Sequence, residues 1–497
     1  MKPRNTARRL GLAGAAGAGL AVAVAGLATA ATGPSTTTAP YLVPSAPGVS
    51  FTSVLTVGDA VGTKPDGSPY RMVGIPDGLG AYDNYDGTFT VLMNHEIASG
   101  GAVRAHGASG AFVSKWTIDK RTLKVLKGED LIQQIAVFDP AAEAWKAAAK
   151  GVALSRLCSA DLPAMSAFYD RQSGLGYRGR LFMNGEESGA EGRAFAHGTD
   201  GTSWELPHLG KFSWENSVAK PDAGRRTVVV GLDDSTPGQV YVYIGRKRRA
   251  GSPIEQAGLV GGQLYGVKVA GVRDERTDAV GGVAPGTAFT LRGLGDVSTD
   301  TGAQLQALSA QRRVTEFNRP EDGVWDPKTG DFYFVTTASF SGTSRLWRLR
   351  FDDPERPQDG GVVDMLLDGT EGQKMMDNLT IQGSSLYIQE DVGNNPRQGK
   401  IWRYDIPSDT LTEVGQHDPA LFTAGQPGFL TEDEESSGII DVSSILGPGK
   451  LLLDVQVHKA SADPELVEGG QLVVLDTKPG RPRWDRPWGG DDDHRDR

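Results

Sequence analysis

A strand pattern recurs along the chain, and this repeat constrains the fold more than any other feature of the sequence. In each copy, a strand of apolar or alternating residues ends in polar or acidic residues, and a loop leads to a second alternating strand. β-Branched and aromatic residues flanked by Gly and Asp turns are typical of β-strands. The best copies of the first strand are 89–96, 181–187, 227–234, 331–337, 386–391 and 451–458, and those of the second are 110–118, 239–244, 344–350, 400–405 and 471–476.

Shorter strands accompany several of these pairs, as at 322–326 before a pair and at 361–367 after one. Four antiparallel strands repeated six times predict an all-β protein, a six-bladed β-propeller in a single domain with elaborated loops and short helices. The early strand 50–57 has no blade of its own, so we expect it to pair with the last blade and close the ring. Short helices are expected over 140–150 and 303–311.

The composition agrees with a turn-rich β protein. The chain has 66 Gly and 28 Pro among 497 residues, nearly one residue in five, where one in eight is ordinary. The formal net charge of −11 would repel nucleic acid and anionic membranes. We therefore expect a small-molecule substrate, no nucleic-acid partner, no membrane attachment once the signal is cleaved, and a monomer.

The N-terminus has the features of an export signal. A basic stretch with Arg8 and Arg9 precedes a long Ala- and Gly-rich run, which predicts a signal peptide over 1–32. The Arg pair suits twin-arginine export, and an ordinary secretory signal is the alternative. We then expect a linker over 33–50, the propeller over 51–480 and a disordered charged tail over 481–497, in a secreted or extracytoplasmic protein.

Cys158 is the one cysteine of the chain, so an intrachain disulfide is excluded and stability must come from a large core or from bound ions. A small buried hydrophobe is the simplest interpretation of Cys158. A metal ligand or a reactive thiol is the alternative.

Acidic residues gather where the repeated strands end or begin. In a propeller the inner strands run along the channel, so these side chains would face one another, and several close carboxylates stay ionised only beside cations. Such oxygen ligands suit Ca²⁺ first and iron or manganese second; the alternative is that each residue is a solvated turn or cap. The predicted metal ligands are Glu96, Glu186, Glu187, Asp233, Asp234, Glu321, Asp322, Asp377, Glu390 and Asp391.

Common catalytic motifs do not account for these residues. The sequence contains no H-E-x-x-H, no G-x-S-x-G and no P-loop, which argues against a zinc protease, a serine hydrolase of the nucleophile-elbow type and a nucleotide triphosphatase. The G-x-G-x-x-G match at 174–179 leads into a strand instead of a helix, so we interpret it as a turn.

Several short motifs occur in an order that resembles the PhoX-type alkaline phosphatases. They are Asn94-His-Glu96, Asn184-Gly-Glu-Glu187, Gly231-Leu-Asp-Asp234, Arg319-Pro-Glu-Asp322 and Asp377-Asn-Leu379. The resemblance implies a six-bladed propeller whose channel mouth carries Ca²⁺ and a pair of iron ions (Fe³⁺), in an exported enzyme that hydrolyses phosphomonoesters.

The resemblance also implies roles for single residues. Arg319 would bind the substrate phosphate and Glu321 would ligate metal, which makes these two the candidate catalytic residues. At two positions where the family has metal ligands, this chain has Gly185 and Ser235. The predicted function is an exported Ca- and Fe-dependent phosphoesterase. Two alternatives stay open: a catalytically inactive Ca-binding secreted propeller, and a Ca-dependent hydrolase of the lactonase type.

Overall fold

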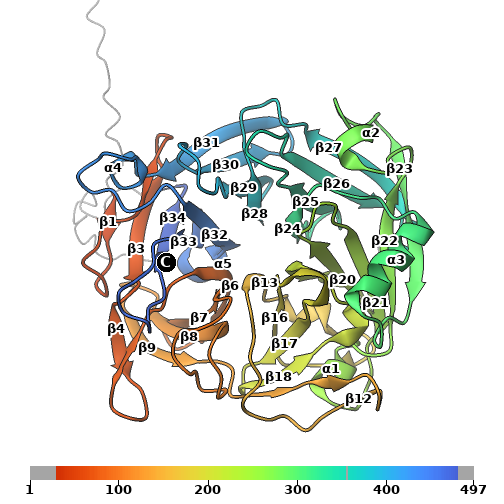
Figure 1. Ribbon diagram of the computed structural model, residues 1–497, viewed down its shortest axis with the longest axis horizontal. Coiled ribbons are helices and arrows are strands. Elements are labelled where there is room, and N and C mark those ends of the chain that lie inside the picture. The colour runs from red at the N-terminus through yellow and green to blue at the C-terminus, as the bar shows by residue number, and fades with distance from the viewer. Residues whose placement is uncertain (1–29, 354–355, 479–497) are drawn as a thin grey trace, which may run out of the picture.

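The protein is built almost entirely of β-strands whose sheets stand around a central axis (Figure 1). The computed structural model describes residues 30–353 and 356–478. The arrangement is propeller-like and confirms the all-β prediction. Most of the predicted signal peptide and all of the predicted charged tail lie outside the described residues. No helix in the described ranges is long and apolar enough to cross a membrane.

Two sheets begin the ring. The first has the strand order β6 (Pro76–Asp83), β7 (Thr88–His95), β8 (Phe112–Asp119) and β9 (Val125–Asp130). The second has the order β13 (Leu157–Asp161), β16 (Leu181–Glu186), β17 (Ala194–Gly198), β18 (Thr202–Glu205) and β10 (Gln134–Ala136). Within each sheet the chain runs outward from the axis by antiparallel neighbours, and β10 adds a parallel strand at the outer edge.

A nine-stranded sheet follows, because two outer strands pair with each other. Its order is β19 (Trp214–Ala219), β20 (Arg226–Asp233), β21 (Val240–Arg246), β22 (Gln263–Val269), β23 (Thr287–Gly295), β27 (Gly361–Leu367), β26 (Arg345–Phe351), β25 (Phe332–Thr336) and β24 (Pro320–Trp325). The junction is the antiparallel β23–β27 pair, so β19 and β24 form its two ends.

Two further sheets complete the ring, and both recruit strands from the N-terminal segment. One has the order β28 (Met376–Gln382), β29 (Ser385–Glu390), β30 (Lys400–Asp405), β31 (Thr410–His417) and β2 (Leu42–Pro44). The other has β32 (Glu434–Asp441), β33 (Lys450–Val457), β34 (Gly469–Asp476), β3 (Ser50–Thr56) and β1 (Ala31–Thr32). The β3–β34 pairing confirms that the early strand joins the last sheet. Since β2 pairs with β31 and buries Leu42, the expected linker packs onto the fold instead.

The remaining elements are short and lie in connections. The two-stranded ribbons are β4 (Ala60–Thr63) with β5 (Pro69–Arg71), β11 (Phe138–Asp139) with β12 (Ala144–Trp145), and β14 (Tyr169–Asp170) with β15 (Leu175–Gly176). The helices are α1 (Pro253–Gln256), α2 (Glu275–Asp278), α3 (Gly302–Arg312), α4 (Pro419–Phe422), α5 (Ser443–Leu446), and the 3₁₀ turns η1 (Met165–Ala167), η2 (Gly189–Glu191), η3 (Pro207–Leu209) and η4 (Pro357–Asp359). Helix α3 confirms one predicted helix. The prediction of a helix over 140–150 was wrong. The Ala-rich segment forms part of the β11–β12 ribbon, in which Phe138 packs on Trp145.

The innermost strands differ from those expected at sequence level. Within the described residues, β6, β13, β19, β24, β28 and β32 contact one another in sequence around the axis, and β32 returns to β6. The long strands predicted as innermost, such as β7 and β16, are therefore second from the axis. The strands that precede them form the lining, and this correction decides which side chains reach the centre.

Close approach between neighbouring innermost strands requires glycine at Gly78. A Cβ there would lie 2.4 Å from the backbone nitrogen of Ala160, and backbone atoms cannot yield as a flexible side chain does. We predict that Gly78→Ala lowers the free energy of unfolding by about 3 kcal/mol, the upper range for overpacking. Gly293→Ala is the matched control, because its nearest neighbour would be a Tyr265 ring carbon at 3.8 Å. Denaturant unfolding of both variants checks this; equal stabilities would contradict the close approach.

Candidate metal centre

Each innermost strand among the described residues contains a β-bulge that re-aims polar residues toward the axis. The bulge lies at the axial acidic or thiol residue in β6, β13, β19, β24 and β28, and beyond Glu435 in β32. A bulge inserts one extra residue and re-aims side chains. Among the described residues, the pairing of each innermost strand with its neighbour shifts at Asp77/Leu79, Leu157/Ala160, Trp214/Ser217, Pro320/Gly323, Met376/Leu379 and Ser437/Ile440. The axial residues at or beside these bulges include Asp77, Cys158, Glu215, Glu321, Asp377 and Glu435.

The strands that are second from the axis supply another set of side chains at their ends. This set lies just above the side chains of the innermost strands. One backbone hydrogen bond positions each of these ends: its N–H donates to the carbonyl of a residue that enters the neighbouring innermost strand. The pairs are Glu96 with Ile75, Glu187 with Arg156, Asp234 with Ser213, Thr337 with Arg319, Asp391 with Met375 and His458 with Asp433, at 2.8–3.1 Å. The repeated bond sets both groups of side chains at one end of the axis.

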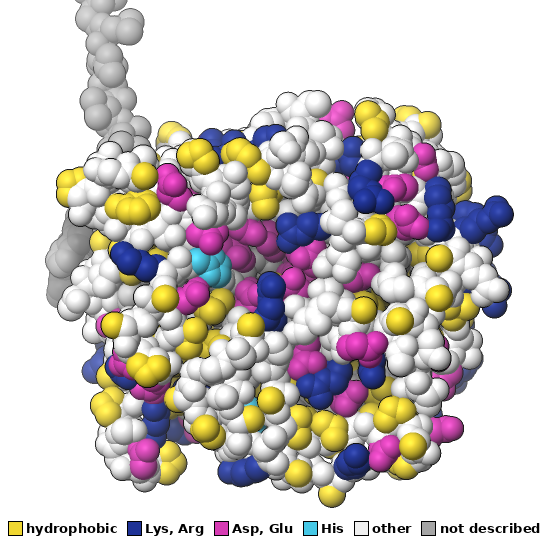
Figure 2. Space-filling view, in the orientation of Figure 1, with side chains coloured by type: hydrophobic (Ala, Val, Ile, Leu, Met, Phe, Trp, Pro, Cys, Tyr) yellow, Lys and Arg dark blue, Asp and Glu magenta, His cyan; other side chains and the backbone are white. Residues whose placement is uncertain are grey.

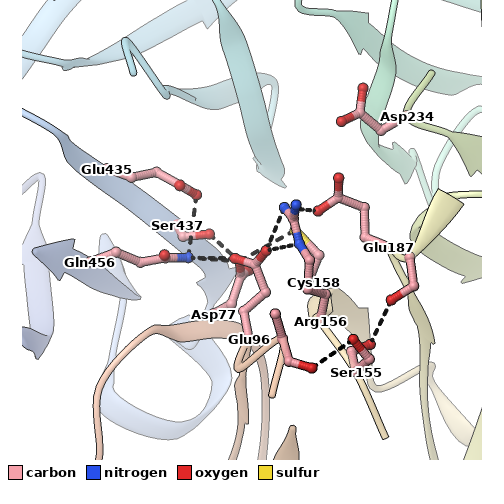
Figure 3. A network of polar contacts seen from close by, with 12 residues as sticks. Asp77, Glu96, Ser155, Arg156, Cys158, Glu187, Asp234, Glu435, Ser437 and Gln456 are labelled. Atoms are coloured by element: carbon pink, nitrogen blue, oxygen red, sulfur yellow. Dashed lines mark hydrogen bonds and ion pairs between the residues drawn. The ribbon is translucent and has the colours of Figure 1, made fainter. Parts of the chain in front are cut away.

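These residues form three overlapping groups whose ligand atoms lie within 4.8 Å of one another. The groups are Asp77–Glu96–Cys158, Cys158–Glu187–Glu215 and Glu215–Glu321–Asp377. Figure 3 shows Asp77, Glu96, Cys158 and Glu187 converging from different strands. In Figure 2, Asp and Glu side chains line a hollow at this end of the molecule, bordered by Lys and Arg. Cys158 links two groups and Glu215 links two, so the site is continuous.

The electrostatics of the centre are unfavourable for its carboxylates alone. Burial, followed by the neighbouring Glu435 and Glu96, raises the pKa of Asp77 well above its usual value. Burial and Glu321 do the same to the pKa of Glu215, and burial and Glu321 to that of Asp377. Oε1 of Glu215 and Oδ1 of Asp377 are buried without a hydrogen-bond partner. Unpartnered buried oxygens that repel one another fit bound cations, because a cation satisfies and neutralises them together.

Cys158 belongs to this centre. Its side chain lies on β13, is 7% exposed, and its thiol donates to Oδ2 of Asp77 at 3.4 Å. Burial, then the charges of Asp77 and Glu215, raise the pKa of the thiol well above its ordinary value. A bound cation would reverse this, because metal coordination deprotonates a thiol. The interpretation of Cys158 as a metal ligand is therefore favoured over that of a simple core residue.

Two arginines lie over the carboxylates at the mouth. Arg319 binds Asp234 through Nε and Nη2 at 2.8 and 2.9 Å, and its Nη2 lies 2.8 Å from Oε1 of Glu321. Arg156 binds Glu96 through Nε at 2.9 Å and also pairs with Glu187. A guanidinium recognises carboxylate and phosphate with the same planar donor geometry.

A hydrogen-bonded layer lies below the metal centre. Asn216 donates to Asp322 at 2.6 Å, and Ser437 donates to Asp77 at 2.8 Å while also bonding Asn378 at 2.6 Å. These contacts tie innermost strands from different sheets together. The layer therefore fixes the spacing of the ligands above it, as a supporting shell does in metal sites.

Six of the ten predicted ligands lie in the two sets of axial side chains: Glu96, Glu187, Asp234, Glu321, Asp377 and Asp391. The other four are engaged elsewhere. Glu186 pairs with Arg193, Glu390 with Arg397, and Asp233 accepts from Ser235 and Gln306. Asp322 lies in the layer below. Adjacent residues of a strand face opposite sides, so only one residue of each acidic pair at the end of a strand second from the axis reaches the centre. The bulge in β24 instead turns Asp322 into the layer below Glu321.

Sequence reasoning missed four acidic or thiol ligands and one arginine. Asp77, Glu215, Glu435 and Arg156 are not among the residues predicted from the sequence, and Cys158 is predicted as a metal ligand only as an alternative. Glycine at 185 is explained by packing, because a Cβ there would lie 2.4 Å from Cβ of Trp214. Ser235 turns its hydroxyl to Asp233 at 2.9 Å, away from the centre. A detectable signal was the polar pair inside several innermost strands, such as Glu215-Asn216 and Asp377-Asn378.

The fold and the site together define a propeller-like protein with a buried, continuous set of side chains that could hold metal ions. The family model of the alkaline phosphatase PhoX matches residues 197–453, just over half of the chain. The protein belongs to the PhoX alkaline phosphatase family, a family of enzymes, as its motifs predicted.

One solved structure supports the fold. PhoX of Pseudomonas fluorescens, in complex with the transition-state analogue vanadate, aligns with a TM-score of 0.62 and 13% identity over 86% of this chain and 95% of that chain. A sialidase of Trypanosoma rangeli aligns with a TM-score of 0.35 and 10% identity over 87% of this chain and 59% of that chain. No curated protein sequence matches the chain.

Proposed function

We propose that this protein is an exported, metal-dependent phosphomonoesterase on a six-bladed β-propeller. The blades would be the four sheets of four or five strands and the two halves of the nine-stranded sheet on either side of the β23–β27 pair. The observation that carries the activity is the continuous set of buried groups, Asp77 to Asp377, with Arg319 at its edge. Family membership supports the same reaction class.

The donor set supports two kinds of cation. Groups made of carboxylates alone, such as Glu215–Glu321–Asp377, suit Ca²⁺. Groups that include Cys158 offer a thiolate beside carboxylates, a mixed set that binds iron and that Ca²⁺ does not prefer. When bound, such ions would neutralise charge on the phosphoryl group and lower the pKa of a water molecule. Cys158 would then supply the thiolate that Gly185 cannot.

Arg319 holds the substrate in this proposal. Its guanidinium is 27% exposed at the mouth, and Asp234 fixes its plane through two hydrogen bonds. It can orient two phosphoryl oxygens while the carboxylates beneath it face the metals. The substrate is a small phosphorylated molecule, and the enzyme acts as a monomer outside the cytoplasm.

The test is an assay of the purified chain with p-nitrophenyl phosphate. We expect release of p-nitrophenol, loss of activity after dialysis against EDTA, and recovery when Ca²⁺ and Fe³⁺ are restored. Retention of Ca²⁺ without phosphate release would overturn the proposal in favour of an inactive Ca-binding module. Cleavage of a lactone but not of the phosphate ester would overturn it in favour of a lactonase.

A further inference from the structure

Arg156 occupies the same place in the repeat as Arg319. Each arginine lies two residues before an axial ligand, Cys158 or Glu321, and each accepts the hydrogen bond that positions the end of the second strand, from Glu187 or Thr337. Both have a positive φ, 43° for Arg156 and 61° for Arg319.

The backbone conformation at these two positions is unfavourable for arginine. A non-glycine residue in the left-handed region is strained by about 1–2 kcal/mol. Ile75 and Met375 enter their strands with the same conformation, so the turn belongs to the repeat and needs no arginine. At two of these four positions the side chain carries a guanidinium, and both guanidiniums pair with carboxylates of the centre.

The guanidinium of Arg156 rests on two candidate metal ligands. It bonds Glu96 and Glu187, and these two carboxylates belong to different metal groups that share Cys158. Figure 3 shows Arg156 between them, beside the thiol. The arginine side chain is 44% exposed, against 8% and 10% for its partners, so it has room to move while they do not.

A cation bound by Glu96 and Glu187 would neutralise the negative charge of these two carboxylates. Cation binding would also weaken the ion pairs of Arg156, because a carboxylate oxygen that binds a cation attracts the guanidinium less strongly. The freed guanidinium then lies at the mouth, across the centre from Arg319. Two such forks could bind different oxygens of one phosphoryl group.

We propose that Arg156 is a second phosphate-binding residue which competes with cations for Glu96 and Glu187 and turns to the substrate when they bind. This proposal rests on the phosphomonoesterase function above. It predicts reciprocal coupling: bound cation strengthens phosphate binding, and bound phosphate strengthens cation binding.

Arg156→Gln tests the competition, with Arg193→Gln as the matched control. Arg193 also binds one buried glutamate, Glu186, through two hydrogen bonds, but outside the metal groups. In calorimetric titration of the chelator-dialysed chain with CaCl₂, we expect Arg156→Gln to bind Ca²⁺ about tenfold more tightly than the wild type, since a nearby like charge is removed. Arg193→Gln should bind as the wild type does. Unchanged or weaker Ca²⁺ binding in Arg156→Gln would overturn the proposal.

Inorganic phosphate tests the second half. On the Ca²⁺-loaded chain, we expect Arg156→Gln to bind phosphate about tenfold more weakly, and Arg156→Lys, which keeps the charge but loses the fork, about threefold more weakly. With p-nitrophenyl phosphate, KM should rise by a similar factor while kcat changes less than about threefold. Unchanged phosphate binding in both variants would overturn the proposal. If the wild type fails to hydrolyse the ester, the phosphomonoesterase function fails, while the two titrations still decide the role of Arg156.

Discussion

Glu321→Gln should lower kcat/KM for p-nitrophenyl phosphate by about a thousandfold, the size of effect expected when a metal ligand and a substrate-orienting contact are lost together. Glu321 is 1% exposed, and one of its carboxylate oxygens lies within 4.8 Å of a carboxylate oxygen of Glu215 and of Asp377. It also pairs with Arg319. An amide keeps the shape of the side chain but removes the charge that both a cation and Arg319 require.

Glu186→Gln is the matched control for this prediction. Glu186 is also buried and also paired with an arginine, Arg193, but it faces away from the axis. Its kcat/KM should stay within about threefold of the wild type, as for a residue outside the reacting site. Steady-state kinetics on both variants, each checked for a native circular dichroism spectrum, decides the matter. An equal loss of kcat/KM in both variants would contradict the assignment of Glu321 to the axis and of Glu186 to the side facing away from it.

Chelation should make the stability of the protein strongly dependent on pH. Burial raises the pKa of Asp161 and of Glu435 to about 7, and burial with offsetting hydrogen bonds leaves that of Asp322 at about 6. Each folded-state pKa lies above the ordinary value of 3.8 or 4.5. The stability that such groups contribute is complete below the unfolded pKa and is lost as the pH rises through the folded pKa.

We therefore expect Tm in EDTA to fall by about 10 °C between about pH 5 and about pH 8, a sum of several kcal/mol over these groups. Bound cations replace protons at the carboxylates of the centre, such as Glu435, so the fall should be smaller in excess Ca²⁺. Asp161 and Asp322 bond to Ala219 and Asn216 outside the metal groups, so their share of the fall should remain. Differential scanning calorimetry in both buffers measures this. The same pH dependence with and without Ca²⁺ would contradict a cation-binding centre.

The sequence alone was sufficient for the long strands and for much of the mouth. Alternation and β-branched content located β7, β16, β20, β25, β29 and β33, and the polar residues at their ends include Glu96, Glu187 and Asp391. These features can be predicted without a structure because they are local. The alternating pattern of a strand and the polar residue that ends it are adjacent in the sequence.

The lining of the axis could not be obtained in this way. Bulges interrupt the alternating pattern of the innermost strands, and contacts between sheets place Cys158 and Glu215. Which of Glu186 and Glu187 faces the axis depends on register, which the sequence of one strand does not specify. Arg156 was overlooked because its role follows from the repeat of Arg319's position in space, which short sequence motifs do not show.

The central claim is that Asp77, Glu96, Cys158, Glu187, Glu215, Glu321 and Asp377 hold metal ions together. Elemental analysis of the purified chain by mass spectrometry tests it most directly, with Glu321→Gln and Glu186→Gln measured beside the wild type. We expect about two or more tightly bound cations per chain, with fewer in Glu321→Gln and the full number in Glu186→Gln. A wild-type chain that hydrolyses p-nitrophenyl phosphate while holding no metal would contradict it.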